Sequence, residues 1–170
     1  MVRVQVIEYP TSSDWIAVKQ RALVTVGKTS DTEPSSEWKD KIITARHSPI
    51  RRLRFSFFIE NIPSCNATHL ARHIHAQPYI MSQRNDRQNK YDRRKAPQDA
   101  PVNMIWDMNA EELMIICDKR LCMKADEVTR QIVAAIRDEV IKLCPEFKPH
   151  LIRMCDYMGR CPEMQPCGQR

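Results

Sequence analysis

The pattern of residues 64–80 allows a helix that must end before a proline. Ser64 is a suitable N-cap, and the apolar spacing after it predicts a helix that continues through His75. Pro78 disfavours helical backbone at the residue before it, so we expect the chain to leave this helix in extended form. The fold must therefore accommodate a helix and an extended segment joined by a sharp break.

Strand-like and helical patterns alternate along the rest of the chain without a regular repeat. Two segments alternate like β-strands, residues 2–8 and 54–59, and four have the spacing of amphipathic helices, residues 13–23, 34–43, 109–121 and 125–143. Because no strand-helix-strand rhythm is present, we predict an α+β fold with an antiparallel sheet flanked by helices and with long C-terminal helices. The 170 residues suit a single catalytic domain, 1–170.

Residues 83–101 are polar and carry almost no side chains suited to a core. A disordered linker is one interpretation of this composition. With the net charge of +6, a basic nucleic-acid-binding module is another, although Asp86 and Asp92 interrupt the basic run. The third is a segment that a ligand or a neighbouring subunit orders.

Location and redox state are also constrained by the sequence. No apolar run reaches membrane-spanning length and the N-terminus lacks a signal-peptide pattern, so we expect a cytoplasmic protein without membrane association. Seven cysteines, an odd number, favour reduced thiols. Cys155, Cys161 and Cys167 are separated by five residues each time, unlike a zinc knuckle, so we predict no metal site. A metal-dependent protein that uses these cysteines is kept as a further alternative.

Anion binding is expected to depend on side chains, because the chain has three glycines and no glycine-rich phosphate loop. Guanidinium groups match phosphate and carbonyl oxygens, and the candidates are Arg72, Arg84, Arg93 and Arg120. His69, Arg72 and His73 share one face of the first predicted helix. Asn109 and Arg120 share a face of a later one, roughly 16 Å apart along its axis.

Four short blocks of residues occur in an order that one enzyme family also shows. The family carries R-H-R and, seven residues later, Ser-x-Arg, and this chain has Arg72-His73-Ile74 and then Ser82-Gln83-Arg84. The other blocks are His47-Ser48-Pro49-Ile50 ahead of Phe55-Ser56-Phe57, then Asp92-Arg93-Arg94-Lys95-Ala96-Pro97, and finally Asn109-Ala110-Glu111-Glu112-Leu113 with Arg120 and Ala125. Together these blocks resemble the flavin-dependent thymidylate synthases, the ThyX family.

The resemblance implies a reaction, its cofactors and an assembly. The family methylates dUMP reductively to dTMP, with FAD as the flavin, methylenetetrahydrofolate as the carbon donor and a reduced pyridine nucleotide such as NADPH. Its members are homotetramers whose active sites form between subunits. A related enzyme that modifies C5 of a pyrimidine nucleotide is an alternative of the same kind.

The resemblance also implies roles for single residues. Arg84 and Arg93 would hold the nucleotide phosphate, Arg72 and Arg120 would face the nucleotide with His69 beside them, and Ser82 would polarise the pyrimidine ring. The expected FAD contacts are Ser48, His73 and Asn109, with His47 and His75 as further candidates.

Several positions depart from the family pattern. They are Ile74 and Glu111 in place of arginine, Ile115 in place of asparagine, Arg46 in place of histidine, and Arg51-Arg52 in place of a Glu-His pair. Most of these changes fall on the flavin side of the expected site, whereas the arginines on the nucleotide side are kept.

Overall fold

The computed structural model describes residues 2–88 and 92–169, without the side chains of Asn85, Gln88 and Arg93. The helices and strands follow one another in an α+β order, as predicted. They are β1 (Arg3–Glu8), α1 (Ser12–Val24), α2 (Ser36–Thr44), η1 (Ser48–Arg52), β2 (Arg54–Pro63), α3 (Ser64–Leu70), β3 (Gln77–Ile80), α4 (Asn85–Gln88), η2 (Arg93–Lys95), β4 (Pro101–Asn109), α5 (Ala110–Arg120), α6 (Glu127–Leu143), η3 (Pro145–Phe147) and α7 (Met154–Met158).

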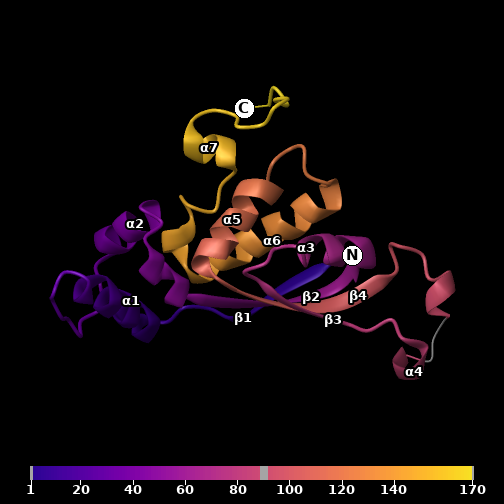
Figure 1. Ribbon diagram of the computed structural model, residues 1–170, viewed down its shortest axis with the longest axis horizontal. Helices are drawn as coiled ribbons and strands as arrows, with labels where there is room; N and C mark the ends of the chain where they lie inside the picture. Colours follow the sequence, from indigo (N-terminus) through magenta and orange to yellow (C-terminus); the bar gives the residue numbers. More distant parts are fainter. Residues whose placement is uncertain (1, 89–91, 170) are drawn as a thin grey trace.

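A four-stranded antiparallel sheet with the order β1-β2-β4-β3 forms the base of the fold. Helices α3, α5 and α6 pack on one face of this sheet (Figure 1). Helices α1 and α2 lie at one end of the molecule, and α4 lies at the opposite end (Figure 1). None of the helices within the described residues is both long and apolar enough to cross a membrane.

The core lies between the sheet and the helices. Alternate residues of β2 and β4 are buried, with Phe57 and Trp106 directly paired across the two strands. Helix α6 adds a buried stripe that includes Ile132 and Ile136. This alternation is the pattern of strands with one face on a core, and the sequence-based prediction of residues 54–59 as such a strand is confirmed.

Two sequence-based predictions about elements were wrong or incomplete. The helix from Ser64 ends at Leu70 and not at His75, and its N-cap is Pro63. The chain turns after Leu70 because β3 must begin at Gln77, where it pairs with β4. Strand β4 itself was not predicted.

Candidate functional site

Three side chains, two from α5 and one from the turn after α3, form one chain of hydrogen bonds. The Nδ1 atom of His73 lies 3.1 Å from Oε1 of Glu112, and Nε of Arg120 donates to Nε2 of His73 at 3.1 Å. Glu112 is 4% exposed, so its carboxylate is a buried acidic group that faces an imidazole. A buried polar network of this kind is stabilising when each member has a partner.

The local structure explains why these residues meet. Helix α5 begins at the N-cap Asn109, whose Oδ1 accepts a hydrogen bond from the backbone N–H of Glu112 at 2.9 Å. Glu112 and Arg120 are eight residues apart on α5, which places them on the same side of the helix. His73 follows the end of α3 in a turn, and its ring contacts the edge of Trp106 with centroids 6.1 Å apart.

Positive groups gather around Arg120. Burial and the neighbouring Arg72 lower the pKa of Arg120. Burial, Arg120 and Arg72 also lower the pKa of His69, while Asp126 opposes this effect. Among the described residues, neither the Arg72 nor the Arg120 guanidinium pairs with a carboxylate. Cationic side chains brought together without acidic partners are suited to bind an anion or electron-rich oxygen atoms.

The structure therefore brings His69, Arg72, His73 and Arg120 together at the ends of α3 and α5. Ser82 and Arg84 lie elsewhere, on the segment between β3 and α4. Arg84 forms a two-point ion pair with Asp86, with Nη2 2.7 Å from Oδ2. Helix α4 follows directly and lies at the far end of the molecule from α1 (Figure 1). The side chain of Arg93 lies outside the described part of the structure.

The residues expected to contact a flavin fall into two groups. Ser48, His47 and His75 are exposed and make no side-chain hydrogen bond with other described residues. Asn109 caps α5 with its amide oxygen, and both ring nitrogens of His73 are engaged with Glu112 and Arg120. The three exposed side chains could contact a ligand, whereas Asn109 and His73 are engaged in contacts within the protein.

Two departures from the family pattern contact one another. Nε of Arg51 lies 2.6 Å from Oε2 of Glu111, and Nη2 lies 3.3 Å from Oε1. The family has an acidic residue at the first position and arginine at the second. This chain carries the opposite charges at these two positions, and the two side chains form an ion pair.

A third departure is part of a second ion pair on α5. Arg46 donates to both carboxylate oxygens of the buried Asp118, at 2.6 and 3.0 Å, and lies over the ring of Tyr157. Arg46 has a φ of 46°, an unusual conformation for arginine. The ion pair accounts for retaining this backbone, because it joins the segment before η1 to the last turn of α5.

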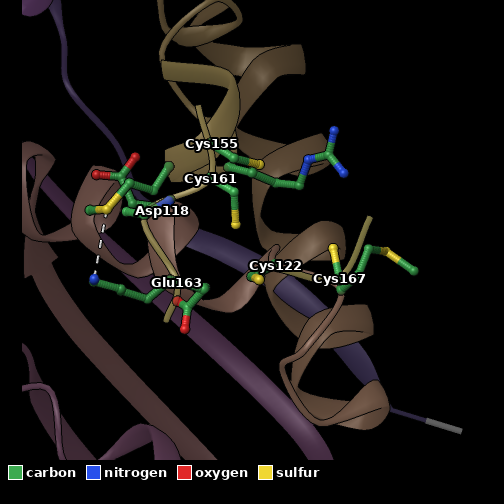
Figure 2. A pocket seen from close by; sticks show the side chains of 11 residues that line it. Asp118, Cys122, Cys155, Cys161, Glu163 and Cys167 are labelled. Atoms are coloured by element: carbon green, nitrogen blue, oxygen red, sulfur yellow. Dashed lines mark hydrogen bonds between the residues drawn. The ribbon is translucent and has the colours of Figure 1, made fainter. Parts of the chain in front are cut away.

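The C-terminal cysteines share one pocket with a fourth thiol. Cys122, Cys155, Cys161 and Cys167 line a pocket beside the end of α5 (Figure 2). Sequence reasoning missed Cys122 because it is distant from the repeat. Within the described residues, no three His, Cys, Asp or Glu side chains are arranged to hold a metal ion.

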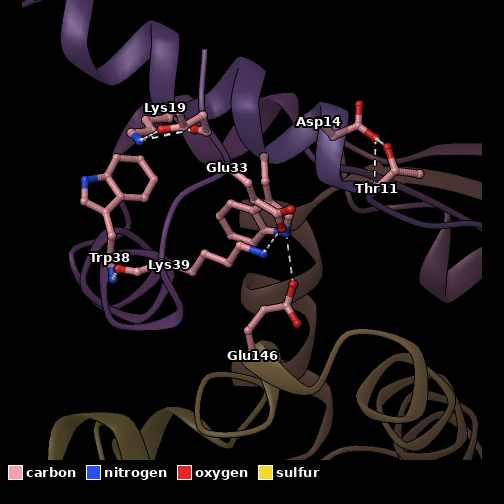
Figure 3. Close-up of polar contacts among 10 residues, drawn as sticks. Thr11, Asp14, Lys19, Glu33, Trp38, Lys39 and Glu146 are labelled. Carbon is pink, nitrogen blue, oxygen red and sulfur yellow. Dashed lines mark hydrogen bonds and ion pairs between the residues drawn. The ribbon is translucent and has the colours of Figure 1, made fainter. Parts of the chain in front are cut away.

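Another polar cluster joins α1, α2 and η3 and is structural (Figure 3). The Nζ of Lys39 lies 2.8 Å from Glu33 and 5.0 Å from the ring centroid of Trp15. Trp15 in turn donates from Nε1 to Glu146 at 3.0 Å. These contacts hold the two N-terminal helices against the C-terminal half.

Comparison with known proteins agrees with the two motif blocks that lie after residue 91. The family model Thy1, described as thymidylate synthase complementing protein, matches residues 92–146. This segment contains β4, α5 and the whole of α6, and with them Asn109, Glu112 and Arg120. No curated protein matches the chain.

The fold is that of an α+β protein, with a cluster of basic side chains at the ends of α3 and α5. The match confirms the predicted resemblance, and over this segment the chain is similar to the thymidylate synthase complementing, or ThyX, family.

Proposed function

We propose that this chain is a flavin-dependent thymidylate synthase that methylates dUMP to dTMP. The observation that carries the proposal is Arg120, whose Nε donates to His73 at 3.1 Å, while neither Arg120 nor the nearby Arg72 has a carboxylate partner among the described residues. Two adjacent positive charges repel, so an oxygen-rich ligand between them stabilises the arrangement. The family match supplies the class of ligand, a pyrimidine nucleotide.

Arg120 is suited to the chemistry of the uracil ring. Hydride addition at C6 of uracil places negative charge on the carbonyl oxygens. A guanidinium held in advance beside these oxygens stabilises that charge without reorganising. Arg120 meets this requirement because its Nε is fixed by His73 and its terminal nitrogens remain available.

The cofactor and co-substrates follow from the family. Bound FAD would supply the hydride and carry the carbon from methylenetetrahydrofolate, with NADPH as the reductant. On this chain Ser48, His47 and His75 are the exposed groups that would contact it. We also infer a cytoplasmic location.

The phosphate contacts point to a site shared between chains. Ser82, Arg84 and Arg93 lie on the segment that leads to and follows α4, and α4 is at the far end of the molecule (Figure 1). We infer that this segment completes the site of a neighbouring copy in a homotetramer. The Arg84–Asp86 ion pair would open so that phosphate replaces the carboxylate.

Two observations on the purified protein test this function. A flavin absorbance spectrum after incubation with FAD tests the cofactor. Calorimetric titration with dUMP and with deoxyuridine tests the phosphate contacts, because Arg84→Ala and Arg93→Ala should weaken only dUMP binding. Equal losses for both ligands would place these arginines outside the phosphate site.

The nucleic-acid-binding alternative is less well supported. Arg84 and Arg94 are paired with Asp86 and Asp92, which reduces the positive charge of the segment. A protein that tracks phosphates would show DNA or RNA affinity that falls steeply with salt. Such binding, in the absence of any dUMP binding, would favour the alternative.

A further inference from the structure

We propose that Glu112 is a positioning residue whose carboxylate fixes the tautomer of His73 and, through His73, the direction of Arg120. The inference rests on the proposed function for the identity of the ligand. Its structural part, the tautomer of His73, stands on the contacts alone.

The hydrogen-bond partners determine where the imidazole proton lies. A guanidinium has only donors, so Nε of Arg120 donates to Nε2 of His73, and Nε2 must carry a lone pair. The ring proton of the neutral imidazole is then on Nδ1. It points to Oε1 of Glu112, 3.1 Å away.

Glu112 enforces this tautomer because an ionised carboxylate only accepts hydrogen bonds. The other tautomer would place a lone pair on Nδ1 against a carboxylate oxygen in a site where Glu112 is 4% exposed. Two buried acceptors facing each other cost free energy, since neither is satisfied. A doubly protonated His73 would instead place an N–H group against the N–H of Arg120.

The tautomer of His73 matters because its Nε2 lone pair accepts the hydrogen bond that orients the Arg120 guanidinium. The Nε and both terminal nitrogens of arginine lie in one plane, so fixing Nε limits the orientation of the other two. The terminal nitrogens of Arg120 make no hydrogen bond with other described residues and are left for a ligand beside Arg72. Glu112 therefore acts on the ligand through two intermediate side chains.

Helix α5 also supplies a matched control. Glu111 is the neighbour of Glu112, carries the same charge and pairs with Arg51 instead of His73. Glu111→Gln and Glu112→Gln change the net charge equally, whereas only Glu112→Gln removes the carboxylate from the imidazole. An amide at position 112 can donate to Nδ1 and thus permits the tautomer that Arg120 cannot contact.

The test is the ¹⁵N NMR spectrum of the imidazoles in ligand-free protein, with His73 assigned by His73→Gln, followed by dUMP calorimetry. We expect Nδ1–H in the native protein and in Glu111→Gln. In Glu112→Gln we expect a gain of the Nε2–H form of His73. We also expect about tenfold weaker dUMP binding, which corresponds to the loss of one charge-assisted hydrogen bond to the ligand. Glu112→Asp, which keeps the carboxylate, should recover part of the affinity.

The outcomes separate this inference from the proposed function. Nε2–H in the native protein would overturn the inference even if Glu112→Gln does not fold. Unchanged tautomer and dUMP affinity in Glu112→Gln would overturn it as well. Nδ1–H in a native protein that does not bind dUMP would support the positioning of Arg120 and refute the proposed function.

Discussion

Replacing Arg120 by alanine should weaken dUMP binding without unfolding the protein. The guanidinium is proposed to donate to the uracil carbonyls, and a hydrogen bond from a charged group contributes about 1.5–3 kcal/mol. This loss corresponds to a roughly 10- to 150-fold higher Kd for dUMP. Arg120→Lys should be intermediate, because an ammonium group cannot contact His73 and present a planar fork at the same time.

The same change has a cost in stability that follows from the contacts. Without Arg120, Nε2 of His73 loses its donor at 3.1 Å. A loss of about 1 kcal/mol lowers the Tm of a domain of this size by roughly 2–4 °C.

Calorimetry with dUMP and thermal unfolding followed by circular dichroism measure the two effects. Arg160→Ala is the charge-matched control, since Arg160 is an exposed residue of the C-terminal segment. A folded Arg120→Ala protein with a dUMP affinity within twofold of the native value would refute the role of Arg120 in binding.

Three further results are expected. Asp118→Ala should lower the free energy of unfolding in urea by about 3 kcal/mol, because it leaves Arg46 without its buried partner; a change below about 0.5 kcal/mol would contradict this. His69 has a folded-state pKa below its ordinary 6.5, so the unfolded chain binds more protons as the pH falls through that value. From neutral to mildly acid pH, the free energy of unfolding of the native protein should therefore fall more than that of His69→Gln. Parallel pH curves for the two proteins would contradict this prediction. The buried Cys117 and Cys144 should resist DTNB until the chain unfolds, because burial raises the pKa of both thiols, for Cys144 to about 12. The other five of the seven free thiols should react with DTNB in the folded protein.

The sequence predicted elements whose signals are local. The amphipathic pattern of α6 and the N-cap Asn109 of α5 depend on residues close in the chain, and both are present. The end of α3 was wrong for a tertiary reason. Ile74 continued the apolar stripe, but it is 86% exposed, because the chain turns away to reach β4.

Strand β4 has an alternating pattern that the sequence-based prediction did not assign to a strand. Its alternate residues are buried, with Trp106 at the centre of the run. The polar segment before β4 favoured a linker, and the N-cap Asn109 at its end favoured a helix. Strand formation depends on partners distant in sequence, here β2 and β3, so a short alternating run is a weaker local signal than a helix.

The candidate site was predictable in part. The motif blocks singled out Arg72, His73 and Arg120, and the structure brings these residues together. Their partner Glu112 was not identified, because its spacing suggested only a helix cap and its contact with His73 spans 39 residues. Arg46 and Asp118 meet across 72 residues for the same reason.

Formation of dTMP is the measurement that tests the central claim most directly. The purified chain should be incubated with dUMP, methylenetetrahydrofolate, FAD and NADPH, and the nucleotides separated and identified by mass spectrometry. We predict dTMP that requires each component and that is absent with Arg120→Ala. A chain that binds dUMP and FAD but forms no dTMP would contradict the proposed thymidylate synthase activity.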